Sequence, residues 1–201
     1  MKVATTLKTL EFDDALAFVE AGGAFVDLRP IDAYLDVHVP GSVGLLYEFG
    51  PGMAQRARDC IPLDVSLILV DVDEVDLQHA AASLRGKGFT VLGAVENAIN
   101  TWAERRGTPA STEVATGAAR PAGRILDVGD PGAKPPQDAA HISIEHLWRR
   151  AAEVGGEERV VIVAGYGVRA ALAVGILERA GVDDLVFWRT RGLTGPQVAS
   201  G

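Results

Sequence analysis

Apolar residues follow two patterns along the chain: short unbroken runs, and stretches in which they are spaced by three and four residues. Unbroken runs at positions 67–70 and 160–163 are typical of buried strands. A short turn follows each run, and then a stretch with helical spacing, VDLQHAAASLRGKG in one case and RAALAVGILERAG in the other. These helices are expected to end at Gly88 and Gly181, in the left-handed conformation that glycine adopts after a helix.

The order of these elements occurs twice. FVDLRP at positions 25–30 corresponds to ILDVGD at 125–130, and LRGKGF corresponds to LERAGV 93 residues later. Strands that alternate with helices predict an α/β protein with two domains, each a parallel sheet flanked by helices, with function at the carboxyl ends of the strands. The boundaries expected are 1–107 for the first domain, 108–123 for a Gly-, Pro- and Ala-rich linker, and 124–201 for the second.

Composition restricts the class of protein. The 201 residues are 48% apolar, and 19 Lys and Arg face 27 Asp and Glu, giving a net charge of −8 that disfavours a nucleic-acid partner. No apolar run approaches the roughly 20 residues that span a bilayer, and no export signal is visible, so a cytoplasmic protein without a membrane partner is expected. The single cysteine, Cys60, excludes an intramolecular disulfide and any multi-cysteine metal site.

The stretch VIVAGYGVRAALA predicts a buried strand, a glycine turn and a helix, which together suit a small anion. Backbone N–H groups at the turn, the helix N-terminus and the Arg169 guanidinium would hold a sulfate-sized or carboxylate ligand. Packing alone could equally account for this turn. Its residues offer no nucleophile; they are Ala164, Gly165, Tyr166, Gly167, Val168 and Arg169.

Both halves resemble the rhodanese-like sulfurtransferase domains, here in tandem. VDLRPIDAYLDVHVPGS is similar to the family signature Asp-x-Arg-x-x-x-Glu-Tyr…His-[Ile/Val]-Pro-Gly-[Ala/Ser], with matches at Asp27, Arg29, Tyr34, His38, Pro40, Gly41 and Ser42, and with Asp32 in place of Glu. AGYGVR resembles the family's Cys-x-x-Gly-x-Arg loop, with Ala164 at the cysteine position. The finer likeness is to the rhodanese portion of bacterial fusions with a metallo-β-lactamase-like persulfide dioxygenase. The four histidines form no clustered metal-ligand motif.

The resemblance implies lost chemistry, because a thiolate at the first loop position carries the transferred sulfur in this family. Ala164 has no atom that can form a persulfide. In the first half the equivalent loop is DVDEVD, with Asp71, Glu74 and Asp76 at the cysteine, glycine and arginine positions. Acids that open a helix are more often N-caps than metal ligands, so no metal or cofactor is expected.

The remaining candidates favour structural roles. Cys60 precedes the strand that leads to Asp71, which places it near the amino end of that strand and away from the loop, as a buried thiol. His38 beside Pro-Gly is interpreted as a residue that fixes the turn. In the second half Gly129 stands where the scaffold arginine belongs, and His141 and His146 lack motif support.

Three functions follow as hypotheses. The first is a catalytically inactive tandem rhodanese-like protein that binds a small anion or a sulfur-handling protein as a regulatory module. The second is a thiosulfate or persulfide sulfurtransferase, or an accessory fragment of one, that uses Cys60 or the thiol of a partner. The third is a dimerisation module, which an exposed apolar patch around Phe187 and Trp188 would favour.

Overall fold

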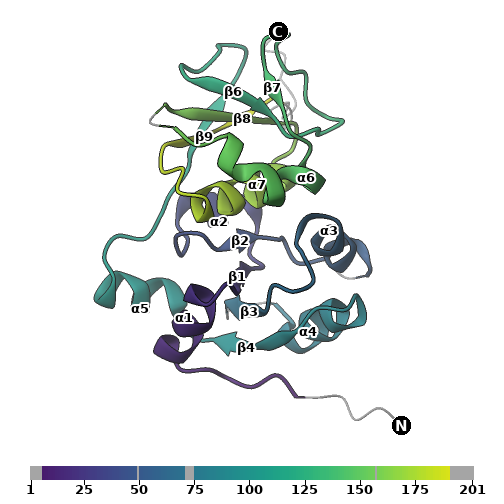
Figure 1. Ribbon diagram of the computed structural model, residues 1–201, viewed down its shortest axis with the longest axis vertical. Helices are drawn as coiled ribbons and strands as arrows, with labels where there is room; N and C mark the ends of the chain where they lie inside the picture. Colours follow the sequence, from purple (N-terminus) through teal and green to yellow (C-terminus); the bar gives the residue numbers. More distant parts are fainter. Residues whose placement is uncertain (1–5, 49, 71–74, 157, 191–201) are drawn as a thin grey trace, which may run out of the picture.

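The protein forms two parallel sheets, with helices of the second half between the second sheet and the first half (Figure 1). The computed structural model describes residues 6–48, 50–70, 75–156 and 158–190. The strand order is β2-β1-β3-β4 in the first sheet and β5-β9-β8-β6-β7 in the second, and all the strand pairs described in both sheets are parallel. The predicted α/β class with two sheets is therefore confirmed.

The first half has a four-stranded sheet with helices on both faces. Its elements are α1 (Phe12–Glu20), β1 (Ala24–Asp27), α2 (Ile31–Asp36), β2 (Val43–Gly44), α3 (Gly52–Cys60), β3 (Leu67–Val70), α4 (Leu77–Gly86), β4 (Val91–Val95) and α5 (Ala98–Arg105). Every residue of β3 is buried, because successive side chains point to opposite faces and both faces are covered. Ile68 and Val70 pack with Phe12 of α1 and Ala98 of α5. Leu67 and Leu69 belong to the core on the other face.

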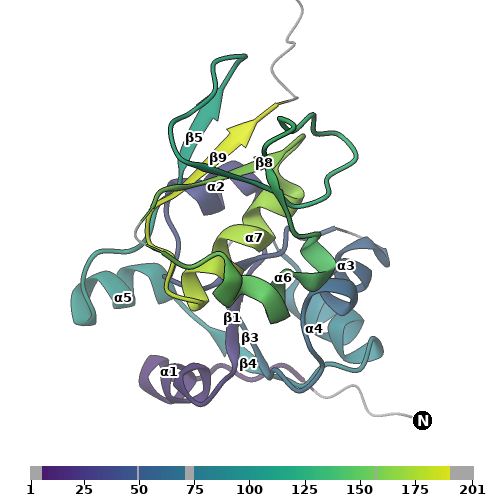
Figure 2. The same cartoon turned by 45° about the horizontal axis from the view of Figure 1, so that its top comes forward.

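The second half has five strands, with its helices on the face toward the first half (Figures 1 and 2). Its elements are β5 (Glu113–Thr116), β6 (Arg124–Asp127), β7 (Ala140–His141), α6 (Ile144–Arg150), the 3-10 turn η1 (Ala151–Glu153), β8 (Val160–Ala164), α7 (Val168–Arg179) and β9 (Leu185–Arg189). The opposite face carries a smaller buried cluster that includes Val161, Val163 and Trp188.

The predicted linker, 108–123, contains structure that its composition does not reveal. Residues 113–116 form β5, which pairs with β9, and His38 and Ala110 form an isolated bridge. The expectation of an exposed connection over the whole segment is corrected accordingly. In the first half, Thr9 bridges Ala94 on the outer edge of β4, in the place that β5 takes beside β9. Both halves therefore share one strand order.

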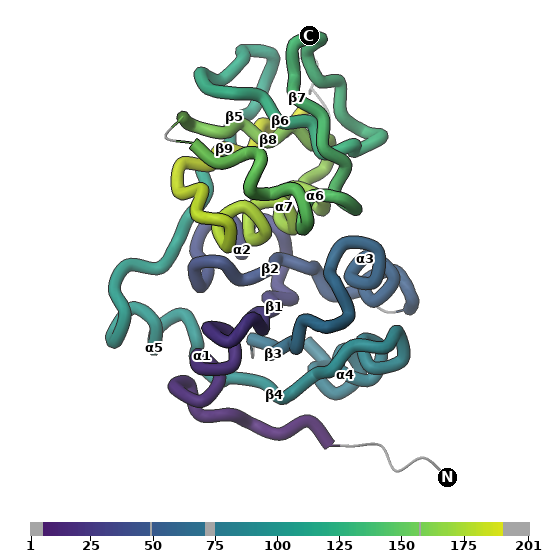
Figure 3. The backbone as a smooth tube through the Cα atoms, in the orientation of Figure 1, coloured from purple at the N-terminus to yellow at the C-terminus, as the bar shows by residue number. Residues whose placement is uncertain are grey.

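Helix α7 joins the two halves, and every residue from 170 to 177 is buried. One side packs on the second sheet, and another packs on β2 of the first (Figure 3). The contact with β2 is close, because a Cβ added at Gly175 would collide with the carbonyl oxygen of Ser42. The helices before Gly88 and Gly181 end as predicted, since these glycines have φ of +97° and +84°.

Two further expectations can be compared with the described residues. Phe187 and Trp188 are buried, and the Trp188 indole N–H donates to the Gly117 carbonyl at 3.0 Å. The exposed patch that would favour a dimerisation module is therefore not formed by these side chains. Within the part of the chain that the structure describes, no helix has the length and apolar character needed to cross a membrane.

Candidate functional site

The glycine turn at positions 164–169 connects β8 to α7, as the sequence predicts. Ala164 is fully buried at the end of β8, whereas Tyr166 is 62% exposed. Gly167 caps α7 with φ of +103°, a conformation that a side chain would strain, and a Cβ there would press on Ile31 and Phe187. The turn thus lies at the carboxyl edge of the second sheet and faces the first half.

The first amide of this turn is bonded within the protein. Gly165 N–H donates to Oδ2 of Asp130 at 2.9 Å, and Oδ1 of the same carboxylate accepts from Gly132 N–H at 2.8 Å. The backbones of Gly132 and Gly165 pack directly together, since a Cβ on Gly165 would lie 2.8 Å from the Gly132 carbonyl carbon. A carboxylate of the chain therefore occupies a donor that an external anion would use.

Arg169 also has internal partners. Its Nη1 donates to the carbonyls of Gly129 at 3.0 Å and Val128 at 3.4 Å, and its Nη2 lies 3.2 Å from Oε1 of Glu145. The sequence singled out Arg169 but gave no sign of Asp130 or Glu145 as its neighbours. Both acids would compete with an anion for the turn.

A cavity of about 460 Å³ lies between the halves beside this turn. From the first half, Arg56, Asp59 and Cys60 of α3 line it; from the second, Glu145, Tyr166 and Arg169 do so. From the sequence we expected Cys60 to lie away from the first-half loop. Sequence reasoning missed that Cys60 lines a cavity with the second-half loop, across the domain boundary. Burial, and secondarily the charges of Glu145 and Asp59, raise the pKa of its thiol to about 12, which leaves almost no thiolate near neutrality.

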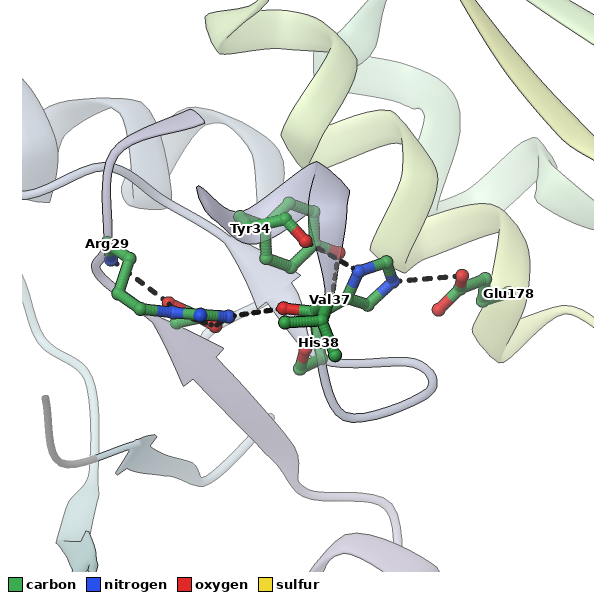
Figure 4. Close-up of polar contacts among 7 residues, drawn as sticks. Arg29, Tyr34, Val37, His38 and Glu178 are labelled. Atoms are coloured by element: carbon green, nitrogen blue, oxygen red, sulfur yellow. Dashed lines mark hydrogen bonds and ion pairs between the residues drawn. The ribbon is translucent and has the colours of Figure 1, made fainter. Parts of the chain in front are cut away.

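The scaffold residues of the first half form a dense polar cluster (Figure 4). The Arg29 guanidinium contacts both carboxylate oxygens of buried Asp27, with Nη2–Oδ2 at 2.7 Å, and also donates to the Val37 carbonyl at 2.6 Å. Tyr34 donates from its hydroxyl to the Ser42 carbonyl at 2.6 Å, and burial raises the pKa of this phenol well above its ordinary value. These contacts fix the connection from β1 to β2.

His38 belongs to the same cluster and reaches the second half. Its ring is fully buried, and Nδ1 lies 2.8 Å from the Tyr34 carbonyl oxygen. Nε2 lies 3.0 Å from Oε1 of Glu178, at the end of α7, and Gly41 N–H donates to Oε2 of that carboxylate at 2.7 Å. Gly41, after Pro40, has φ of +72°. Sequence reasoning missed Glu178, because it is 140 residues from His38 and matches no motif.

In the second half a histidine contacts the scaffold aspartate in place of an arginine. Gly129 N–H donates to Oδ1 of Asp127 at 2.9 Å, just as Arg29 N–H donates to Asp27 at 3.0 Å. No guanidinium follows, and Nδ1 of His141 contacts Oδ2 of Asp127 at 2.8 Å instead. His141, which the sequence left without a role, therefore contacts the scaffold aspartate.

The acidic loop of the first half lies partly outside the residues that the structure describes. Asp71 and Glu74 lie outside the described residues. Asp76 is the N-cap of α4 and accepts from His79 N–H at 2.9 Å, as the capping interpretation predicts. Among the described residues, no group of three or more His, Cys, Asp or Glu side chains could hold a metal ion.

The parallel α/β fold, the Asp27–Arg29 scaffold and the glycine turn ahead of α7 define a rhodanese-like fold. No family model matches the sequence. The chain is 32% identical over 98 residues to thiosulfate sulfurtransferase GlpE of Pseudomonas syringae pv. syringae (strain B728a), a match that covers 49% of this chain and 89% of the relative. It therefore belongs to the thiosulfate sulfurtransferase family.

Two solved structures are similar at lower identity. A thiosulfate sulfurtransferase from Pseudomonas aeruginosa is 17% identical, with 93% of this chain and 41% of that chain covered, at a TM-score of 0.39. An NAD-dependent persulfide reductase from A. fulgidus is 20% identical, with 56% of this chain and 24% of that chain covered, at a TM-score of 0.35. This chain therefore spans less than half the length of either structure.

Proposed function

We propose that the protein is a catalytically silent tandem member of the sulfurtransferase family that acts by binding, as a regulatory module linked to sulfur metabolism. One observation carries the proposal: Ala164 stands at the start of the turn, where the family carries its sulfur-accepting thiolate. The side chain is buried, and the next residue gives its N–H to Asp130. This turn therefore offers thiosulfate neither a nucleophile nor a free first donor.

Binding at the turn would have to overcome the acids that already hold it. A small oxyanion or carboxylate must displace Asp130 from Gly165 N–H and compete with Glu145 for Arg169. Such binding is expected to be weak and to decrease with added salt, because the contact is charge-assisted and partly exposed. A carboxylate or oxyanion presented by a sulfur-handling protein is the partner that we propose for this face.

The position of Cys60 favours a second candidate, a sulfurtransferase that uses this thiol. Cys60 lines the cavity that also contains Tyr166 and Arg169, so a donor in that cavity would meet both the thiol and a guanidinium. Against it, the thiol pKa of about 12 leaves almost no thiolate near neutral pH. Catalysis would require substrate to lower that value greatly.

A thiosulfate:cyanide assay separates the two candidates. We expect no thiocyanate above the reagent blank from the protein or from Cys60→Ser, because neither loop position offers a thiolate. The Pseudomonas syringae relative, assayed in parallel, is the positive control. Thiocyanate production that disappears in Cys60→Ser would overturn the silent assignment and establish the second candidate.

A further inference from the structure

The His38–Glu178 contact links the two halves through a ring that has hydrogen-bond acceptors on both sides (Figure 4). On one side, the Tyr34 carbonyl can only accept, so Nδ1 must carry a proton. On the other side, an ionised Glu178 can also only accept, so Nε2 must carry a second proton. The alternative is a neutral ring that accepts from a protonated Glu178.

Both arrangements contain the same number of protons. A doubly protonated ring with a carboxylate holds two, and a singly protonated ring with a carboxylic acid holds two as well. If one is lost, a ring nitrogen lone pair faces an acceptor oxygen, either the Tyr34 carbonyl at 2.8 Å or a Glu178 carboxylate oxygen at 3.0 Å. The ring is fully buried, whereas the Glu178 side chain is 13% exposed and lines a cavity of about 500 Å³ with Arg179 and Asp183. Facing lone pairs are costly because the buried ring nitrogen cannot turn to water.

Within the part of the chain that the structure describes, the ring bonds to Tyr34 and Glu178, and the neighbouring groups have other contacts. Tyr34 stacks on it with centroids 4.2 Å apart, and its hydroxyl is committed to the Ser42 carbonyl. The Arg29 guanidinium is held by Asp27 and the Val37 carbonyl. Arg179, the next residue of α7, packs over the ring of Trp148 with Cζ 5.1 Å from its centroid. The His38 backbone pairs with Ala110, which has no charge.

We propose that His38 and Glu178 form a proton-dependent latch between the halves, which is closed near neutral pH and weakens as the pH rises. This inference does not depend on the proposed function. When the chain unfolds, the separated groups at about pH 8 hold one proton, since free histidine is neutral and free glutamate ionised. The folded pair holds two. The unfolded state binds fewer protons, so stability falls with rising pH until the latch loses its proton. Over this range the folding equilibrium constant decreases by at most about tenfold per pH unit.

Glu178→Gln tests the latch without removing its geometry. A glutamine carbonyl can accept from Gly41 N–H, and its NH₂ can donate to a neutral Nε2, so every bond is kept without the additional proton. Urea unfolding is measured from about pH 6 to about pH 9, above and below the free histidine value. We expect the stability of the unaltered protein to fall relative to that of Glu178→Gln across this range. Cys60 contributes equally to both and cancels in the comparison.

Glu104→Gln provides the matched control, because it removes one exposed carboxylate from α5, a helix that contributes neither residue of the latch. Its profile should parallel that of the unaltered protein. Parallel profiles for Glu178→Gln would overturn the proposal. A second measurement needs no variant: nuclear magnetic resonance at about pH 7.5, above the free histidine value, should show one proton on Nδ1 and another between Nε2 and the Glu178 carboxyl. A pair that holds only one of these two protons would also overturn it.

Discussion

At the residue scale, the two scaffold aspartates show how one site can be held by different side chains. Asp27 is paired by Arg29 two residues later, whereas Asp127 is paired by His141 on the neighbouring strand. Gly129 has φ of +75°, so an arginine in its place would be strained. The sequence marks Asp27 and Arg29 as scaffold residues through the family resemblance, without stating that they pair. It could not predict His141, because that contact depends on the register of β6 and β7, in which Asp127 lies opposite His141.

Cys60 gives a pH-dependent prediction at the same scale. With a thiol pKa of about 12, only about one thiol in ten thousand is ionised at about pH 8, so alkylation by iodoacetamide should be far slower than for a free cysteine. Because folding raises this pKa, its stabilising effect is complete below the unfolded value of about 8.5 and is lost as the pH rises toward 12. Alkylation rates in the native and urea-unfolded protein test this directly. Equal rates in the two states would contradict it and would reopen the role of Cys60 as a nucleophile.

At the element scale, the sequence predicted the strands and helices with strong patterns and missed those defined by pairing. β3, β8, α4 and α7 follow from unbroken apolar runs and helical spacing. β5 did not, because its four residues lie among Gly, Pro, Ser and Thr and gain their order from β9. The turn at positions 164–169 was predicted correctly, but Asp130 was not, because the segment that delivers it follows a different strand.

The contact of α7 with β2 predicts that Gly175 cannot be enlarged. Gly175→Ala should destabilise the protein by about 1–3 kcal/mol, because the added methyl group meets the Ser42 carbonyl and the helix must shift. Gly86→Ala in α4 is the matched control: its Cβ would meet nothing within 4 Å, and alanine favours helix by up to about 1 kcal/mol. Urea unfolding should separate the two variants. Similar effects from both would show that the close packing of α7 is dispensable.

At the scale of the whole molecule, one core extends through both halves. Val26, Leu67 and Leu69 of the first sheet belong to the same buried cluster as Ile162 and Phe187 of the second, with α7 among them. Polar contacts reinforce the junction at the His38–Glu178 pair and at the Asp32–Arg189 ion pair. The sequence predicted α7 from its helical spacing, but it could not show that a strand of the other half covers a second side of this helix. The predicted domains are thus similar in strand order and joined in their packing.

A shared core predicts that the two halves unfold together. Separating them would expose the buried residues of α7 to water at a cost of about 25 cal/mol for each Å² of apolar surface, so a state with one half folded should not accumulate. Tryptophan fluorescence can follow each half, because Trp102 lies in α5 and Trp188 in β9. Two variants each keep one of these residues and have the other tryptophans replaced by phenylalanine. Once the effect of the replacements on the stability of each variant is corrected for, both should unfold at the same urea midpoint. Two separated transitions within a single protein, followed by circular dichroism, would show instead that each half folds alone and that α7 only rests on its neighbour.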